Sequence, residues 1–244
     1  MIFFTLKSKI FWIFFVILLG SICGIYWLKG HSAPQLIGEA FFSIKTDKKV
    51  AALTFDDGPS TPYTQQILDI LKKHDIKATF FLLGSEVQKY PDLVERIYTE
   101  GHEIGNHSWS HARLIFKTPT FIREEIESTD QLIRRLGYTG PLHFRAPYGN
   151  KLLILPWILK NMDRPHILFD VIPKDWELTS PQIIAQRVGE QLHPGAIILL
   201  HDGGGERSNT VNSLELILAH MKENNYQLLT ISELLKLDEK RKIK

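Results

Sequence analysis

Apolar runs of strand length alternate with segments of helical period along most of this chain. The apolar runs cover residues 50–55, 78–83, 103–106, 143–146, 167–171, 196–200 and 227–230. Helical periodicity marks the segments 63–73, 91–99, 119–136, 152–160, 181–191 and 212–222. Alternation of this kind is typical of parallel βα units, in which helices cover a parallel sheet. The pattern therefore predicts an α/β fold.

The length available limits the number of βα units. Residues 47–237 offer roughly 190 positions, whereas a full barrel of eight units takes about 250. We therefore predict a single domain with a barrel-like sheet of seven units. Reactive side chains in such folds lie in loops at the C-terminal ends of the strands, so functional residues are expected there.

Charge and cysteine content exclude several classes of function. Lys and Arg together number 29 against 27 Asp and Glu, so the chain is nearly neutral. A protein that binds nucleic acid through its phosphates needs clustered cations, and the only local excess is a basic tail at 238–244, which we interpret as a solvated end. The single cysteine, Cys23, excludes a disulfide framework and a cysteine-rich metal site. Any metal ion must therefore bind through His, Asp or Glu.

An uncharged apolar stretch of 19 residues, 10–28, precedes the predicted domain. At a rise of about 1.5 Å per residue its length matches the roughly 30 Å core of a bilayer. We expect residues 1–29 to form a membrane anchor or an uncleaved signal, followed by a linker over 30–46. Lys7 and Lys9 precede the stretch and Lys29 follows it, which predicts a cytoplasmic N-terminus and a single-pass protein with its domain outside the cytoplasm.

Polar residues gather where the predicted strands end. Asp56 and Asp57 follow the first strand, and Gly58 after them also allows a plain turn. The third strand leads to His107 and His111, which share one face if that segment is helical. Two imidazoles and one carboxylate from the neighbouring strand would form a set that leaves coordination positions open, as catalytic zinc sites do.

Three further strand ends add polar side chains. Arg145 follows the fourth strand, Asp175 lies beyond the fifth, and His201 ends the sixth. A guanidinium can hold a carboxylate, and a histidine can transfer protons near neutral pH. His201 taken alone is better explained as a structural histidine in the core. The convergence of five strand ends on one rim favours an active site.

Five short motifs occur in a fixed order: TFDDGP at 54–59, HSWSH at 107–111, RAPYG at 145–149, DW at 175–176 and LLH at 199–201. On these motifs the region from about Val50 to Leu235 resembles the polysaccharide deacetylases, the NodB-type domain of carbohydrate esterase family four. The resemblance implies a distorted (β/α)7 barrel, which agrees with the seven strands counted above. It also implies that residues 47–237 form the catalytic domain.

The resemblance implies a role for each matching residue. Asp57, His107 and His111 would bind a divalent metal ion, usually zinc, while Asp56 would be the general base and His201 the general acid. The remaining matches would orient and line the site. Arg145 would orient Asp56, Asp175 would support the acid and base, the backbone N–H of Tyr148 would face the oxyanion, and Trp176 and Leu199 would line the pocket for the acetyl methyl.

One motif departs from the family pattern. Members often carry Trp-Asp-Val-Asp before the final Asp-Trp pair, whereas this chain has Phe169 and Ile172 in place of the outer residues. The change bears on packing and polarity beneath that loop, and hence on rate or substrate preference. Asp170 is kept outside the expected catalytic set.

Together these features predict a membrane-anchored, metal-dependent hydrolase that removes N-acetyl groups from an N-acetylglucosamine polymer. The expected order of substrates is peptidoglycan, then another surface polysaccharide, then chitin oligomers. Zinc is the expected metal, although cobalt, nickel and manganese suit the same ligands. Two alternatives remain open. Paired carboxylates at a barrel rim could serve a glycosidase, and the chain could be a catalytically idle domain that binds glycan at the membrane.

Overall fold

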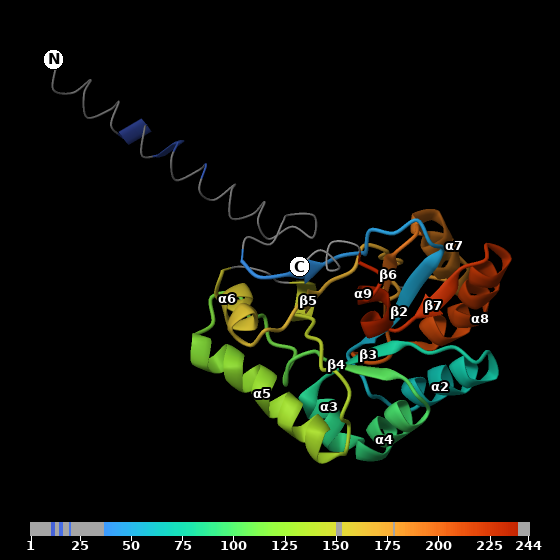
Figure 1. Ribbon diagram of the computed structural model, residues 1–244, viewed down its shortest axis with the longest axis horizontal. Coiled ribbons are helices and arrows are strands. Elements are labelled where there is room, and N and C mark those ends of the chain that lie inside the picture. Colours follow the sequence, from blue (N-terminus) through green and yellow to red (C-terminus); the bar gives the residue numbers. More distant parts are fainter. Residues whose placement is uncertain are drawn as a thin grey trace.

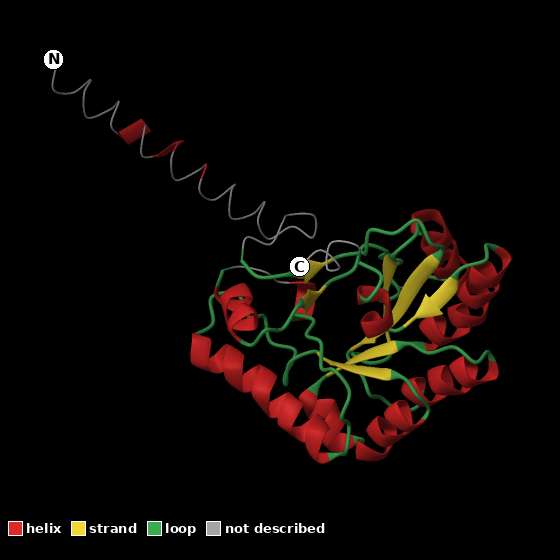
Figure 2. Cartoon of the chain, viewed as in Figure 1, coloured by secondary structure: helices red, strands yellow, loops and turns green. Residues whose placement is uncertain are grey.

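The computed structural model describes residues 11, 12, 15, 16, 20, 37–149, 153–177 and 179–238. In this part of the chain every pairing between named strands is parallel. Helices cover the outside of the strands (Figure 2). The predicted α/β fold is confirmed.

The strand β2 (Val50–Asp56) lies at the centre of the sheet, and all of its residues are buried. On one side it pairs with β6 (Ala196–His201) along its length. On the other side its first half pairs with β7 (Gln227–Leu229) and its second half with β3 (Thr79–Leu82), which continues to β4 (Glu103–Asn106). Continuous apolar runs in β2 and β6 fit strands that are covered on both faces.

Short pairings carry the sheet beyond β4. Phe144 bridges Asn106 on one side and His166 on the other, and β5 (His166–Ile167) pairs with β1 (Ala40–Phe41). A bridge between Val171 and Ile198 then leads back to β6. The pairings therefore fit a distorted barrel.

Two of the predicted strands are much shorter than expected. The segment 143–146 is reduced to the bridge at Phe144, and 167–171 contributes only the end of β5 and the bridge at Val171. The Arg145 side chain donates hydrogen bonds to the carbonyls of Ile167 and Leu168, both at 3.2 Å. Those carbonyls are thereby engaged by a buried side chain and do not extend the strand pairing.

The helices follow the predicted segments with two differences. They are α2 (Tyr63–Lys73), α3 (Gly84–Lys89), α4 (Pro91–Thr99), α5 (Pro119–Arg135), α6 (Ile154–Asn161), α7 (Pro181–Gln191), α8 (Ser208–Glu223) and α9 (Ile231–Leu235), with a 3-10 turn at Pro147–Gly149 (Figure 1). Sequence reasoning missed α3, which is only six residues long and has no side-chain cap. It also began α8 four residues too late. Ser180 caps α7 as the sequence suggests, accepting a hydrogen bond from the N–H of Ile183.

The N-terminal predictions are only partly covered. Most of the apolar stretch 10–28, including Cys23, lies outside the described residues, and no described helix has the length and apolar character needed to cross a membrane. The end of the expected linker is already part of the domain. Besides β1, Ser43 bridges Ala196 and Ile44 is buried.

Candidate metal and catalytic site

The strand register brings the predicted site residues to one end of the sheet. Asp56, the last residue of β2, is paired with His201 at the end of β6. On its other side Asp56 is paired with Phe81, and β4 next in order ends at Asn106, directly before His107. Polar residues that follow neighbouring strands therefore meet at the same rim, as the parallel sheet predicts.

Asp57, His107 and His111 form a cluster that could hold a metal ion. One ligand atom from each residue lies within 4.8 Å of the others. The Asp57 Oδ1 atom is 3.4 Å from His107 Nε2 and 3.2 Å from His111 Nε2. Oδ1 is buried and accepts no hydrogen bond from the described residues. A buried carboxylate oxygen without a donor, facing two imidazoles, fits a divalent cation.

The two histidines meet through a turn, so the condition that this segment be helical is not met. Residues 107–111 form a loop in which Ser108 and His111 have φ angles of 71° and 58°. The Asn106 side chain stabilises the turn, because its Oδ1 accepts a hydrogen bond of 2.7 Å from the N–H of Ser108. The two imidazole centroids lie 5.2 Å apart as a result.

The orientation of His107 follows from its hydrogen bond. Its Nδ1 lies 2.9 Å from the Arg145 carbonyl, which can only accept, so Nδ1 carries the proton and Nε2 presents a lone pair toward Asp57. Burial lowers the pKa of His107 to about 3, which keeps the ring neutral. A neutral imidazole fixed by a backbone carbonyl is a typical metal ligand.

A glycine loop after β6 packs against Asp57. A Cβ atom on Gly203 would lie 2.1 Å from the Asp57 carbonyl oxygen, and one on Gly204, with φ of +72°, would lie 2.6 Å from Asp57 Oδ2. The buried Arg207 side chain donates hydrogen bonds of 2.7 and 3.1 Å to the carbonyls of these two glycines. Only glycine fits this close approach.

Asp56 is held by a buried arginine, as the resemblance implies. Arg145 Nη1 donates to Asp56 Oδ1 at 2.6 Å and to Thr54 Oγ1 at 2.8 Å. The guanidinium lies 4.0 Å from the ring centroid of Phe81 and 5.3 Å from that of Phe169. Phe169, one of the departures from the family pattern, therefore still presents an aromatic ring to Arg145. Burial raises the pKa of Asp56, although the Arg145 charge opposes the shift.

His201 forms a dyad with Asp175. The Asp175 carboxylate accepts from His201 Nδ1 and from the His201 backbone N–H, each at 2.8 Å, and from Thr210 Oγ1 at 2.8 Å. Burial alone would lower the pKa of His201, but the charge and hydrogen bond of Asp175 outweigh it and raise the pKa. Burial alone would raise the pKa of Asp175. The charge of His201 and the hydrogen bonds from His201 and Thr210 outweigh burial and lower this pKa.

The remaining predicted residues surround this centre. The Trp176 ring meets the His201 ring edge to face at 5.3 Å and is 46% exposed, whereas Leu199 is buried. Tyr148 has a φ of 58° and its ring lies 4.6 Å from that of His111. The guanidinium of Arg113 lies 4.0 Å from the Tyr148 ring centroid. Sequence reasoning missed Arg113, whose one signal is its position two residues after His111.

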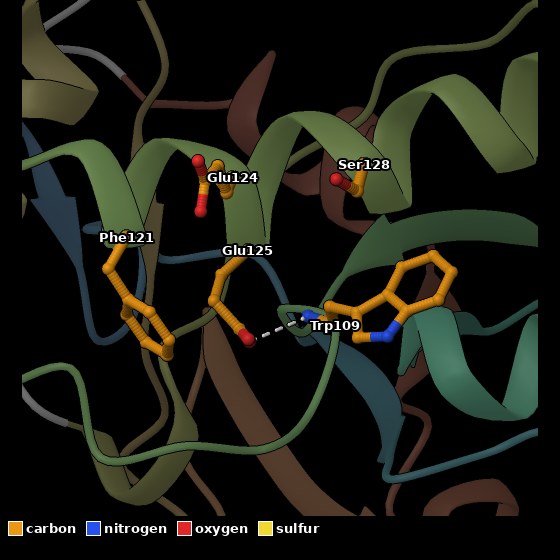
Figure 3. Close-up of a pocket in the computed structure, with 5 residues that line it drawn as sticks. All are labelled: Trp109, Phe121, Glu124, Glu125 and Ser128. Carbon is orange, nitrogen blue, oxygen red and sulfur yellow. Dashed lines mark hydrogen bonds between the residues drawn. The ribbon is translucent and has the colours of Figure 1, made fainter.

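A second missed residue is Glu125 on α5, which fixes the histidine loop from outside (Figure 3). Its Oε2 accepts from the N–H groups of Trp109 and Ser110 at 3.0 and 2.9 Å, and its Oε1 accepts from Ser110 Oγ at 2.7 Å. The carboxylate is buried beside a pocket of about 220 Å³ that Glu124 also lines. In the sequence Glu125 resembles an ordinary surface charge of a helix.

A third missed residue is Asp202, directly after His201. It is fully buried, and its Oδ2 accepts a hydrogen bond of 2.6 Å from Thr64 Oγ1. Burial raises the pKa of Asp202 to about 7, because charging the carboxyl there is unfavourable. A Cβ on Gly58 would lie 2.1 Å from this carboxylate, so Asp202 fixes the glycine of the first motif.

Comparisons with known proteins agree with this geometry. The family model described as polysaccharide deacetylase matches residues 43–164. A peptidoglycan-N-acetylglucosamine deacetylase of Bacillus cereus is 36% identical over 82% of this chain and 74% of its own length. The peptidoglycan-N-acetylmuramic acid deacetylase PdaC of Bacillus subtilis is 37% identical over 83% of this chain, which spans only 42% of that relative.

A solved structure supports the same grouping. The Bc1960 peptidoglycan N-acetylglucosamine deacetylase, crystallised with a naphthalenyl benzamide compound, superposes with a TM-score of 0.77 at 36% identity. The match covers 81% of this chain and 92% of the other.

Glu125 provides a test of how the histidine loop is held. We expect Glu125→Ala to weaken zinc binding by about 10- to 100-fold, because the loop that carries both histidines loses three hydrogen bonds. Glu125→Gln, which keeps one acceptor, should weaken it less. Isothermal titration calorimetry with Zn²⁺ measures the affinity, and thermal unfolding checks that each variant is folded. Glu124→Ala, one residue earlier and exposed, is the matched control. Equal zinc affinity in wild type and Glu125→Ala would contradict this role.

Proposed function

The chain belongs to the polysaccharide deacetylase family, and from that membership we propose that it hydrolyses N-acetyl groups of N-acetylglucosamine residues in a cell-wall polysaccharide. The observation that carries the proposal is one carboxylate and one imidazole, Asp56 and His201, in paired positions of β2 and β6. Asp56 Oδ2 is 3.8 Å from the Nε2 atom of His107, one of the three residues that could hold a metal ion. Peptidoglycan is the favoured substrate, because both relatives described above are named as peptidoglycan deacetylases.

Asp57, His107 and His111 are the proposed metal ligands, and zinc is the favoured ion. A divalent cation held there would polarise the acetamide carbonyl and acidify a water molecule. Cobalt, nickel or manganese would suit the same two imidazoles and one carboxylate. The buried Asp57 oxygen that accepts no hydrogen bond from the described residues supports this assignment.

Asp56 is the proposed general base. Its Oδ1 accepts from Arg145, so Oδ2 is the oxygen left to take a proton from the attacking water. A pKa raised by burial makes this carboxylate a stronger base than an exposed aspartate. Arg145 acts as a positioning residue, because its guanidinium binds Oδ1 of this carboxylate and not Oδ2.

His201 is the proposed general acid. Asp175 holds Nδ1 and favours the protonated ring, so Nε2 can give its proton to the amine nitrogen as the carbon–nitrogen bond breaks. The products are acetate and the free amine of the sugar. We assign the oxyanion to the backbone N–H of Tyr148 and the acetyl methyl to Trp176 and Leu199, on the resemblance and on their positions around His201 and His111.

We also propose that residues 10–28 anchor the chain in the cytoplasmic membrane, with the catalytic domain outside. Support comes from the length and apolar character of this stretch and from Lys7 and Lys9 before it. A cell-wall substrate is compatible with that location.

Metal dependence provides the direct test of the proposed reaction. The full chain should release acetate from N-acetylglucosamine oligomers and from peptidoglycan. A chelator should abolish the release, and added zinc should restore it, because the carbonyl and the water both require the cation. Enzymatic determination of acetate gives the readout. New reducing ends without acetate would support a glycosidase instead, and zinc binding with neither product would support an idle glycan-binding domain.

The role of His201 can be tested against a second histidine that also pairs with an aspartate. We expect His201→Asn to lower kcat by about 10²- to 10⁴-fold, because the leaving amine loses its proton donor. The matched control is His193→Asn. His193 Nε2 lies 2.7 Å from Asp170 Oδ2, but its side chain is 44% exposed and outside the proposed site, so kcat should not change. A wild-type kcat for His201→Asn would contradict the assignment.

A further inference from the structure

Helix α6 carries apolar side chains on both of its faces. Its inner face packs against α5 residues Ile122 and Ile126 in one buried cluster, to which α6 contributes Leu155, Ile158 and Leu159. Its outer side leaves Leu153, just before the helix, 56% exposed, Ile154 38% exposed and Trp157 47% exposed. Exposed apolar side chains that lie together often mark a site for a protein, ligand or membrane partner. The outer side of α6 is therefore expected to meet an apolar partner.

The position of α6 in the fold indicates which partner that is. Four residues separate the end of α6 from β5, and β5 pairs with β1 (Ala40–Phe41), the first strand of the domain. In Figure 1, α6, β5 and β1 lie on one side of the domain, whereas α2 lies on the other. Helix α6 is thus on the side of the domain that contains its first described strand, β1.

The connecting chain is short. Residues 29–36 lie between the apolar stretch and the start of the domain, and eight residues span at most about 30 Å when fully extended. If residues 10–28 lie in the bilayer, this side of the domain cannot move farther than that from the lipid surface. A short tether of this kind raises the effective concentration of the lipid surface near this side of the domain.

We propose that the outer side of α6 docks on the headgroup region of the bilayer that anchors the chain. The inference rests on the membrane anchor proposed above. Trp157 is the residue type enriched at membrane interfaces, and Leu153 and Ile154 supply the apolar area that such an interface buries. Lys160 in the last turn can extend to anionic headgroups. The polar residues of the helix, Lys160 and Asn161, lie at its C-terminal end, so this face offers few hydrogen-bonding groups to a glycan.

A neighbouring loop adds another exposed apolar side chain. Residues 112–118 contribute Leu114 to the cluster beneath α6, and Phe116 in that loop is 79% exposed. Tyr148 at the proposed catalytic centre precedes Leu153 by only five residues. Docking of α6 would therefore hold the catalytic centre close to the membrane and favour glycan that lies next to it.

The test uses the full chain in vesicles of phosphatidylcholine and phosphatidylglycerol. In a Cys23→Ser background, Leu153→Cys is labelled with an environment-sensitive NBD fluorophore, and the vesicles contain lipid with a doxyl quencher near the headgroup. The matched control is Asp75→Cys, whose native side chain is 97% exposed between α2 and β3. We expect blue-shifted emission and quenching at position 153, and neither at position 75.

A second variant checks that the contact is made by the helix face. Ile154→Gln combined with Trp157→Gln should abolish the blue shift and quenching at position 153. It should leave flotation with the vesicles and acetate release from soluble oligomers unchanged, because neither residue belongs to the catalytic centre.

The outcomes separate docking from the proposals on which it rests. Flotation of the protein without quenching at position 153 overturns docking and leaves the anchor intact. A blue shift without lipid quenching that grows with protein density indicates a second copy on this face, and a shift produced by added peptidoglycan fragments indicates glycan; both overturn docking. Failure to float overturns the anchor and docking together, while metal-dependent acetate release tests the enzyme independently.

Discussion

A fully buried guanidinium must find a counter-charge and several acceptors inside the protein, and the geometry of the site depends on how Arg145 does so. Its side chain binds the carboxylate of Asp56 and lies between the rings of Phe81 and Phe169. Its backbone carbonyl accepts from Nδ1 of His107. One residue thus fixes both the proposed base and one proposed metal ligand, so the relative positions of the two depend on Arg145.

The outer helix α5 provides the second support for the site. Asn106 turns the chain after β4, and its Nδ2 donates to Asp130 on α5 at 2.7 Å, where Arg164 also binds. Glu125, just over one turn earlier, binds two N–H groups of the histidine loop. Buried carboxylates that accept backbone N–H groups restrict a loop strongly, because each lost contact leaves an unsatisfied polar group. The candidate metal site is therefore held by Arg145, inside the sheet, and by helix α5, outside it.

Much of this arrangement could be predicted from the sequence, because continuous apolar runs reveal buried strands such as β2 and β6, and because the ordered motifs name the residues at their ends. Features that depend on tertiary contacts could not. The pairing near Phe144 is interrupted by the side chain of Arg145, and the histidines meet through a left-handed Ser108. Glu125 is buried where its carboxylate binds the histidine loop. None of these features has a periodic signal in the sequence.

The adjacent carboxylates Asp56 and Asp57 show how neighbouring like charges can have separate surroundings. Successive residues of a strand point to opposite faces, but a φ of 74° at Asp57 turns the chain at the strand end. Asp56 then meets Arg145, and Asp57 meets two histidines, of which His107 is kept neutral by burial. A glycosidase needs two carboxylates that flank a sugar bond from separate positions. Here one carboxylate has a protein counter-charge, whereas the charge of the other would be matched by a divalent cation held beside the histidines.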